Sequence, residues 1–214
     1  MDTEVFLIVL FSAFLHAIWN SMASKYKDKN VSIGAIVYGH VPLCIVAIIF
    51  LPAPSIESFP YIILSALIHQ GYQNFLLTAY QTGKFTTVYP VARGFGPLVA
   101  TIISIIFLGV YLKAFTIVSI LLISLGVMLI GFFSKSVIKN NKILYTSLAT
   151  GVFIGIYSVV DGQGARISGS AISYMSWVFV FSALFFPVVL HFRKQKNILK
   201  KTLTKGKVVF WIGG

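Results

Sequence analysis

Eight hydrogen-bonding residues lie inside long apolar segments of this chain, where binding or helix association is the usual reason for their presence. Polar groups are costly in hydrocarbon, so they tend to face the interior of a helix bundle or a water-filled path. Their chemistry is that of ligand recognition, with imidazoles, amides, a phenol and a guanidinium. The eight residues are His16, Asn20, His69, Gln70, Gln73, Asn74, Tyr89 and Arg93.

The first two of these residues are four positions apart, so His16 and Asn20 share one face of a helix. They either line a substrate cavity or form interhelical hydrogen bonds of about 1 kcal/mol each. His40 lies in another apolar segment without polar neighbours, and we expect it to be a packing or interfacial residue.

The segment around residue 70 is the most polar of the apolar segments. His69 and Gln73 form one row at helical spacing, and Gln70 and Asn74 form the next. A neutral histidine beside amides would suit a polar or zwitterionic metabolite, and His69 could also carry a proton because imidazole titrates near neutral pH. The alternative is a buried network that only holds the helices together.

Prolines and glycines surround Arg93, at Pro90, Gly94, Gly96 and Pro97. Proline removes a backbone donor and glycine loosens a helix, so we expect the first two turns of this segment to be broken or kinked. Carriers use the backbone groups exposed at such breaks to bind ligands. Arg93 would bind or gate an anionic substrate group, tie helices together, or extend to the lipid head groups.

Asp161 adjoins the end of an apolar segment and is followed by Gly162, Gly164 and Arg166. One interpretation is a helix-ending turn in which Asp161 bonds the local backbone or Arg166. The other is a gate or proton site. No carboxylate lies in the middle of an apolar segment, so the sequence does not by itself indicate proton coupling.

The composition narrows the class of protein. Of the 214 residues, 57% are hydrophobic and 10% are charged, against roughly 25% charged residues in a soluble domain. These values exclude a soluble globular enzyme and a disordered chain. The single cysteine, Cys44, excludes an intramolecular disulfide and a cysteine zinc site. The motifs of ATPases, zinc proteases and serine hydrolases are missing from the sequence, so we expect no enzyme, cofactor or metal.

Seven apolar windows of 18 to 22 residues are long enough to cross a bilayer, which takes about 20 residues. We therefore predict an all-α, polytopic helical protein of a cytoplasmic (inner) membrane. A basic segment at 193–207 follows the seventh window, and the apolar run Val208–Gly214 would start an eighth helix. The windows are Val5–Met22, Val31–Leu51, Tyr61–Tyr80, Val88–Leu108, Ala114–Phe133, Ile143–Val160 and Ala171–Phe192.

Lysine and arginine are distributed unequally between the two sets of connections. Those after the first, third, fifth and seventh windows hold 14 of them, and the opposite set holds 2. Because positive residues accumulate in cytoplasmic loops, this count predicts an external N-terminus. The net charge of +12 is therefore an orientation signal rather than a nucleic-acid footprint. We expect 193–207 to contact anionic lipid.

Two segments match earlier ones at an offset of about 137 residues. Ser12–Asn20 resembles Thr150–Ser158, and Ser32–Tyr38 resembles Ser168–Tyr174, in their order of small, aromatic and polar residues. A repeat of five helices turns its second copy upside down, which is a common construction of secondary transporters. The predicted units are a first five-helix repeat at 1–135 and an incomplete inverted repeat at 143–214.

The runs FLHAIWNSMASKYK (Phe14–Lys27), FTTVYPVARGFGPLVATIISIIFLG (Phe85–Gly109) and VVDGQGARISGS (Val159–Ser170) carry a family resemblance. They are similar to segments of the EamA family of the drug/metabolite transporter superfamily, and the most specific part is YPVARG at Tyr89–Gly94. The resemblance implies a ten-helix carrier built from two inverted five-helix repeats, of which this chain supplies the first repeat and part of the second.

The function we expect is a secondary, non-ATP carrier that exports small organic metabolites or drugs by alternating access. Its cavity would lie between the first, third, fourth and sixth windows. The alternative is a non-transporting membrane subunit or an inactive fragment of a longer ten-helix transporter. The expected partners are a small-molecule substrate and the lipid bilayer but not nucleic acid, and a homodimer is left open.

Overall fold

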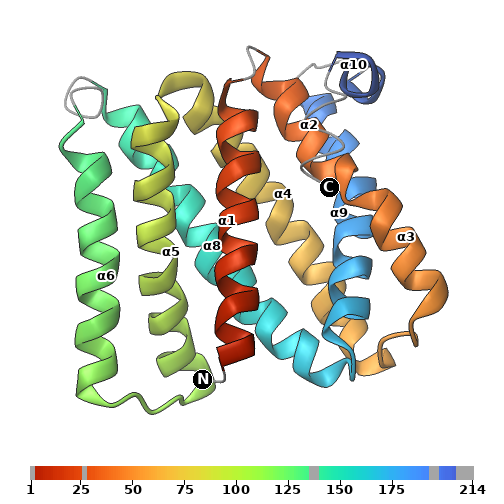
Figure 1. Ribbon diagram of the computed structural model, residues 1–214, viewed down its shortest axis with the longest axis horizontal. Coiled ribbons are helices and arrows are strands. Elements are labelled where there is room, and N and C mark those ends of the chain that lie inside the picture. Colours follow the sequence, from red (N-terminus) through yellow and green to blue (C-terminus); the bar gives the residue numbers. More distant parts are fainter. Residues whose placement is uncertain (1–2, 26–27, 135–139, 193–197, 206–214) are drawn as a thin grey trace.

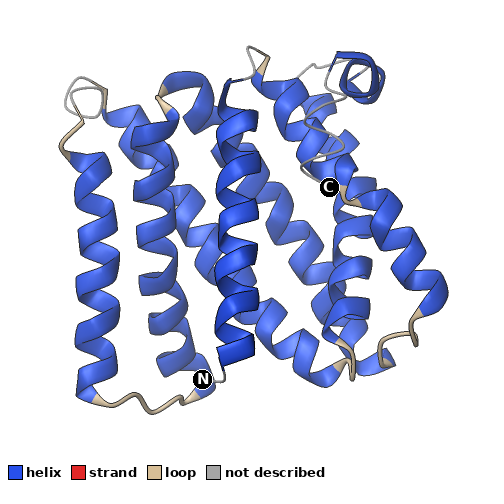
Figure 2. Cartoon of the chain, in the orientation of Figure 1, coloured by secondary structure: helices blue, strands red, loops and turns tan. Residues whose placement is uncertain are grey.

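The computed structural model describes residues 3–25, 28–134, 140–192 and 198–205. Within these ranges every regular element is a helix and no strand occurs (Figure 2). The all-α class is thus confirmed, and the seven predicted windows lie on helical residues except at His40, Leu51 and Phe133. The helices are α1 (Thr3–Lys25), α2 (Lys29–Gly39), α3 (Val41–Phe50), η1 (Ile56–Ser58), α4 (Phe59–Thr82), α5 (Phe85–Leu108), α6 (Ala114–Phe132), α8 (Asn141–Ile167), α9 (Ala171–Phe192) and α10 (Ile198–Lys205).

Five helical segments are long and apolar enough to cross a membrane, as judged by length and composition. Their length and composition are those of membrane-spanning helices and indicate a membrane protein, and the count of seven spans stays a prediction. Helix α4 has the length but is too polar to meet the same measure, and the described side chains of α1 include the apolar stretch Thr3–Leu15. The five segments are Lys29–Phe50, Phe85–Leu108, Ala114–Phe132, Asn141–Ile167 and Ala171–His191.

The helices form one bundle in which α8 has the central position. It crosses the bundle obliquely and packs against both α4 and α5, while α6 packs on the outer side of α5 (Figure 1). Helix α9 packs against α3 and α4. The two parts of the predicted repeat are therefore in direct contact, and the repeat itself stays a prediction.

Helix α5 differs from the expectation that its first two turns are broken. It runs without interruption through Pro90 and Pro97, so a break is wrong here, and the alternative of a kink stays a prediction. Helices α6 and α8 pack on α5 closely enough to hold it in place. A Cβ atom on Gly94 would lie 2.7 Å from the Ser124 carbonyl oxygen of α6, so this glycine permits close helix contact rather than flexibility.

The interrupted span is instead the second one, where His40 is a single turn residue between α2 and α3. Pro42 lies at the start of α3 and has no N–H to donate to the carbonyl of Tyr38, four residues earlier. The helical ladder resumes when the Cys44 N–H donates to the His40 carbonyl at 2.9 Å. The break therefore lies near the middle of the segment Lys29–Phe50.

Helix α8 is longer than predicted, because it continues through Asp161 to Ile167. The expected helix-ending turn at Asp161 is therefore wrong. Gly164 gives space to the Tyr174 ring, which a Cβ atom there would overlap, so this glycine supports packing within the helix. The end of α8 is anchored when the Ser55 hydroxyl donates to the Ile167 carbonyl at 3.0 Å.

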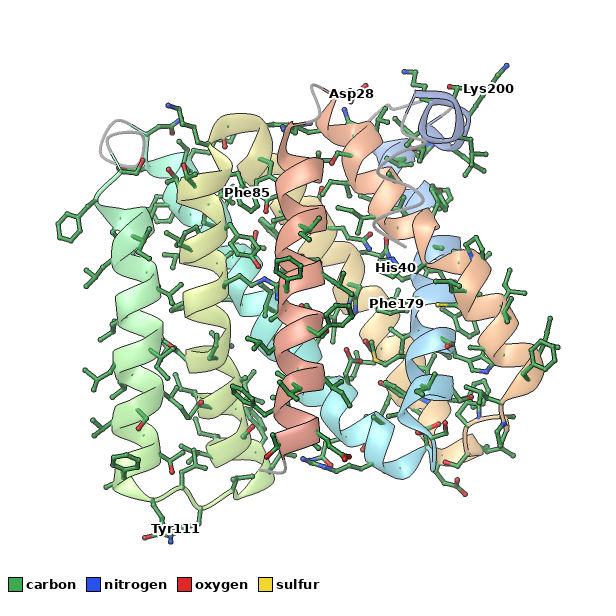
Figure 3. All side chains as sticks on the ribbon, viewed as in Figure 1. Asp28, His40, Phe85, Tyr111, Phe179 and Lys200 are labelled. Carbon is green, nitrogen blue, oxygen red and sulfur yellow. The ribbon has the colours of Figure 1, made fainter. Side chains whose placement is uncertain are left out.

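The two ends of the bundle differ in the connections that they carry. Asp28 and Lys200 lie at one end and Tyr111 at the other (Figure 3). Helix α1 begins at the end of the bundle that carries Tyr111 and finishes at the end that carries Asp28 (Figure 1, Figure 3). Which side of the membrane that end faces remains the prediction from the Lys and Arg count.

Helix α10 lies within the basic segment 193–207 and packs against α2. Ile198 and Thr202 are buried in this contact, whereas Lys200 and Lys201 are exposed. The expected lipid contact stays a prediction, and 193–197, 206–207 and the apolar run Val208–Gly214 lie outside the described residues.

Candidate functional site

A cavity lies between α2, α4, α5, α8 and α9, and it holds about 990 Å³ of space free of atoms, including its open mouth. Aliphatic side chains of α2 form one wall, and the polar residues come from the other helices, from the turn at His40 and, in α2 itself, from Ser32. The polar and ionisable side chains in its lining are Ser32, His40, His69, Tyr72, Gln73, Tyr80, Arg93, Tyr157, Asp161 and Ser182.

The cavity brings together four of the predicted site residues, namely His69, Gln73, Arg93 and Asp161. They come from three helices that are distant in the sequence, α4, α5 and α8. The third, fourth and sixth windows therefore contribute as expected. The second and seventh windows contribute as well, through α2 and α9, which the sequence analysis did not foresee.

The other predicted residues have different positions. Gln70, Asn74 and Tyr89 belong to the same helices but are not part of the cavity lining. His16 and Asn20 lie in α1, and their side chains are outside the described part of the structure. Their expected role in the cavity therefore stays a prediction.

His69 is held in one orientation on α4. Its ring Nδ1 lies 2.9 Å from the Ser65 carbonyl oxygen, and because a carbonyl only accepts, Nδ1 carries the hydrogen in this contact. The ring also stacks on Tyr157 of α8 at a centroid distance of 4.3 Å and an interplanar angle of 26°. The imidazole is thus fixed from two helices, which leaves Nε2 as its second polar atom.

Asp161 joins α8 to α4 and α9. The Tyr174 hydroxyl donates to its Oδ1 at 3.1 Å, and Ser65 also hydrogen-bonds to the carboxylate. Asp161 interacts electrostatically with His69 across the cavity wall. The carboxylate thus interacts with hydroxyls of two neighbouring helices. It could hold a proton or bind a cationic group of a ligand.

Arg93 lies among aromatic rings. Its Cζ atom is 5.5 Å from the centroid of the Tyr89 ring, a distance suited to a cation–π interaction. Tyr72 and Tyr80 of α4 and Tyr157 of α8 also interact with the guanidinium. These rings hold a planar cation beside the cavity, where it could recognise a carboxylate or another anionic group.

Gln70 and Gln73 attach α4 to α9 through the Ser182 hydroxyl. The Nε2 atoms of the two amides lie 3.0 Å and 3.3 Å from this oxygen. Both Oε1 atoms are buried and have no hydrogen-bond partner among the described residues. Gln73 is 8% exposed and lines the cavity, so its amide oxygen can accept a hydrogen bond from a ligand.

Several lining residues were missed or misjudged in the sequence analysis. His40 lines the cavity, and the Pro42 that follows it was a local signal for a helix break there. Tyr157 could have been noticed as the residue that matches Trp19 in the repeat. Phe179 and Ser182 had no distinguishing signal, because they occur within a nearly uniform apolar window.

Comparison of the chain with protein-family models, with curated proteins and with solved structures found no match. The resemblance to the EamA family therefore stays a prediction. Among the described residues, no group of three histidine, cysteine or acidic side chains is arranged to hold a metal ion. The candidate site thus rests on its geometry and on the chemistry of its lining.

Proposed function

We propose that this chain is a secondary membrane carrier for small organic molecules and that the cavity is its substrate site. The observation that carries the proposal is a cavity between apolar, membrane-length helices that is lined by both Arg93 and Asp161. Charged side chains within membrane helices are costly, and they commonly mark a transport pathway. The EamA resemblance points to the same class of protein.

The lining favours a zwitterionic substrate. Arg93 binds its anionic group as a planar fork, and Asp161 accepts its cationic group. Gln73 supplies a buried, uncharged amide oxygen, which can accept a hydrogen bond from a substrate hydroxyl or amine. The stacked rings of His69 and Tyr157 offer an aromatic surface against which a planar part of the substrate packs.

Alternating access requires that helices move about the site. The break at His40 divides a membrane-length segment near its middle and lies in the cavity wall. Discontinuous helices at the binding site are a recurring feature of carriers. We infer that the two halves of this segment, α2 and α3, change their relative orientation during the cycle.

The test uses the full chain reconstituted in vesicles of phosphatidylcholine and phosphatidylglycerol. Vesicles loaded in turn with radiolabelled zwitterionic, anionic and cationic metabolites are assayed for exchange against the same external solute. We expect protein-dependent exchange that is fastest for zwitterions and that needs no ATP. Equal release from protein-free vesicles for every solute would contradict the carrier.

A second candidate is a non-transporting membrane subunit, and one observation favours it. Every described side chain of α1 from Thr3 to Leu15 is exposed, and the large hydrophobic ones, such as Ile8 at 68% and Phe11 at 61%, lack protein cover. Another membrane helix could cover this surface. If the reconstituted chain binds zwitterions but exchanges none of them, this second candidate is preferred.

A further inference from the structure

A second hollow lies between α3 and α9, and we call it the α3–α9 groove. It holds about 780 Å³ of space free of atoms, including its open side, and its exposed lining is almost entirely apolar. The residues that matter for the argument are His40, Leu43, Cys44, Ile172, Met175 and Phe179.

The open side of the groove faces outward from the bundle. Leu43 of α3 is 65% exposed and Ile172 of α9 is 67% exposed, and both belong to segments long enough to cross a membrane. Exposed aliphatic side chains on such helices meet lipid hydrocarbon. A bilayer around these helices would place lipid hydrocarbon at the open side of the groove.

The groove and the candidate cavity share a wall made of His40, Met175 and Phe179. The rings of His40 and Phe179 stack with a centroid distance of 4.8 Å and an angle of 28°, and Figure 3 shows the two side by side. On its other side Phe179 presents an edge-on contact to His69, at a centroid distance of 6.4 Å. A layer of two stacked rings thus separates an apolar, lipid-facing space from a polar, charged one.

The wall coincides with the interruption in the helical ladder. His40 is the turn residue between α2 and α3, so its ring is carried by the point at which that span can bend. A change in the angle between α2 and α3 would part the His40 ring from Phe179, because Phe179 belongs to α9. The two spaces would then be continuous.

We propose that the cavity and the α3–α9 groove together bind a single-chain zwitterionic amphiphile that enters from the bilayer. The proposal rests on the proposed function, because it uses the cavity as a ligand site and names a substrate class for it. The charged head group lies with Arg93 and Asp161, and the hydrocarbon chain lies in the groove beside Met175. The charge signs of the lining match a zwitterionic head, and the apolar groove matches the chain.

The test is photolabelling of the reconstituted full chain with dodecylphosphocholine that carries a diazirine at the end of its chain. Labelled peptides are mapped by mass spectrometry with and without excess unlabelled dodecylphosphocholine. We expect labelling of 41–50 and 171–179 that the competitor removes, and labelling of the lipid-facing side of α6 that the competitor leaves. Groove labelling that persists like that of α6 would show ordinary lipid contact and overturn the proposal.

A matched pair of variants tests whether the groove holds the chain. Ile172→Trp narrows the mouth, and Leu122→Trp makes the same change on α6, at residues that are 67% and 68% exposed. Neither substitution fills a buried space, so both variants are expected to fold. We expect Ile172→Trp to weaken competition about tenfold, the effect of excluding roughly two methylene groups from an apolar site. Equal competition in the two variants would overturn the proposal.

The outcome also separates this inference from the carrier proposal, because labelling does not depend on transport. Competed groove labelling in a chain that exchanges no solute would support the amphiphile site and count against the carrier. Exchange of soluble zwitterions without competed labelling would support the carrier and overturn the amphiphile site. An unlabelled alkane without a head group serves as the control competitor, and we expect it to leave the groove labelling unchanged.

Discussion

Helices α4 and α6 are both long enough to cross a membrane, but they differ in almost every other respect. Helix α6 is strongly apolar, and only Ser124, Met128 and Gly131 are buried along it. Helix α4 is too polar to meet the measure for a membrane span, yet it buries His69 and Gln73, which line the cavity, and Gln70, which links it to α9. The helix that is too polar for this measure is therefore the one that contributes more lining residues to the cavity than any other helix.

The difference follows from what surrounds each helix. Helix α6 packs chiefly against α5, so most of its side chains face the surroundings, and in a bilayer these must be apolar. Helix α4 contacts α8 and α9 along much of its length, and polar side chains there find partners such as Ser182. Apolarity marks exposure to lipid, whereas burial by other helices permits polar chemistry.

The largest effect on exchange is expected when the positive charge of Arg93 in the cavity lining is removed. In Arg93→Gln the guanidinium that would bind an anionic group is lost while a polar side chain remains. Losing one partner of a buried charge pair costs about 2–5 kcal/mol, so we expect exchange of a zwitterionic solute to fall at least thirtyfold, to roughly 3% or less. The measurement is initial exchange rate in reconstituted vesicles at a fixed substrate concentration.

Lys113→Gln is the control, because Lys113 is exposed at the start of α6 and lies outside the cavity lining. It removes the same charge, and exchange should remain as in the parent chain. If both variants lose exchange equally, the loss reflects net charge and not the cavity.

The next largest effect concerns insertion of the two helices on their own. We expect the segment 114–132 to enter a bilayer unaided in a translocon insertion assay, and 59–82 to enter less efficiently. Ile123→Lys should make the free energy of insertion of 114–132 less favourable by about 3 kcal/mol, because a lysine then lies near the centre of the helix. If 59–82 inserts as well as 114–132, the contrast between a lipid-facing helix and one that depends on its neighbours is wrong.

A smaller effect is expected from two serines that are equally buried, each 2% exposed. Ser182 receives hydrogen bonds from Gln70 and Gln73, whereas the Ser124 hydroxyl has no partner among the described residues. Ser182→Ala should lower the free energy of unfolding by about 1–3 kcal/mol, because the buried Gln73 amide loses its acceptor, whereas Gln70 keeps the Ala66 and Ser182 carbonyl oxygens. The measurement is chemical unfolding in mixed micelles.

Ser124→Ala provides the comparison for that change, and it should leave stability unchanged or slightly higher. The substitution removes a buried hydroxyl that is not hydrogen-bonded to any described group. Equal destabilisation by the two alanine substitutions would mean that the polar links of α4 contribute no more than ordinary packing.

The smallest effect is expected at α10, whose contact with α2 lies outside the cavity. Thr202 is fully buried and its hydroxyl has no partner among the described residues. Thr202→Val keeps the shape and removes that hydroxyl, so it should raise stability by about 1 kcal/mol. Thr204→Val is the exposed counterpart, where a hydroxyl donates to the Lys200 carbonyl at 2.8 Å, and the change should stay within about 0.5 kcal/mol. A loss of stability in Thr202→Val would mean that its hydroxyl is hydrogen-bonded in the membrane.

The prediction of elements from the sequence was good where the pattern was simple and local. Apolar windows identified helical segments, and Asp28, which precedes α2, accepts hydrogen bonds from the Asn30 and Val31 backbone N–H groups as a capping residue should. The glycines and prolines were harder to interpret. Pro97 lies inside a continuous helix, whereas Pro42 coincides with a break, because neighbouring helices decide whether the lost hydrogen bond is tolerated.

For the candidate site, the sequence could identify the polar residues but not their grouping. His69, Gln73, Arg93 and Asp161 stood out as polar residues in or beside apolar segments, and the structure brings them to one cavity. Gln70 stood out for the same reason, yet it serves as a link to α9 instead of lining that cavity. One turn of helix separates the two outcomes, and only the position of the neighbouring helix decides between them.

The sequence alone determined that the chain is helical and apolar, which residues are costly in hydrocarbon, and where its positive charges gather. These properties are local, because each depends on composition over one segment. The tertiary structure decided that α8 lies between α4 and α5, that Asp161 is inside a helix, and that His40 and Phe179 form a wall between two spaces. Such contacts join residues far apart in the chain, and they depend on how helices pack against one another in three dimensions.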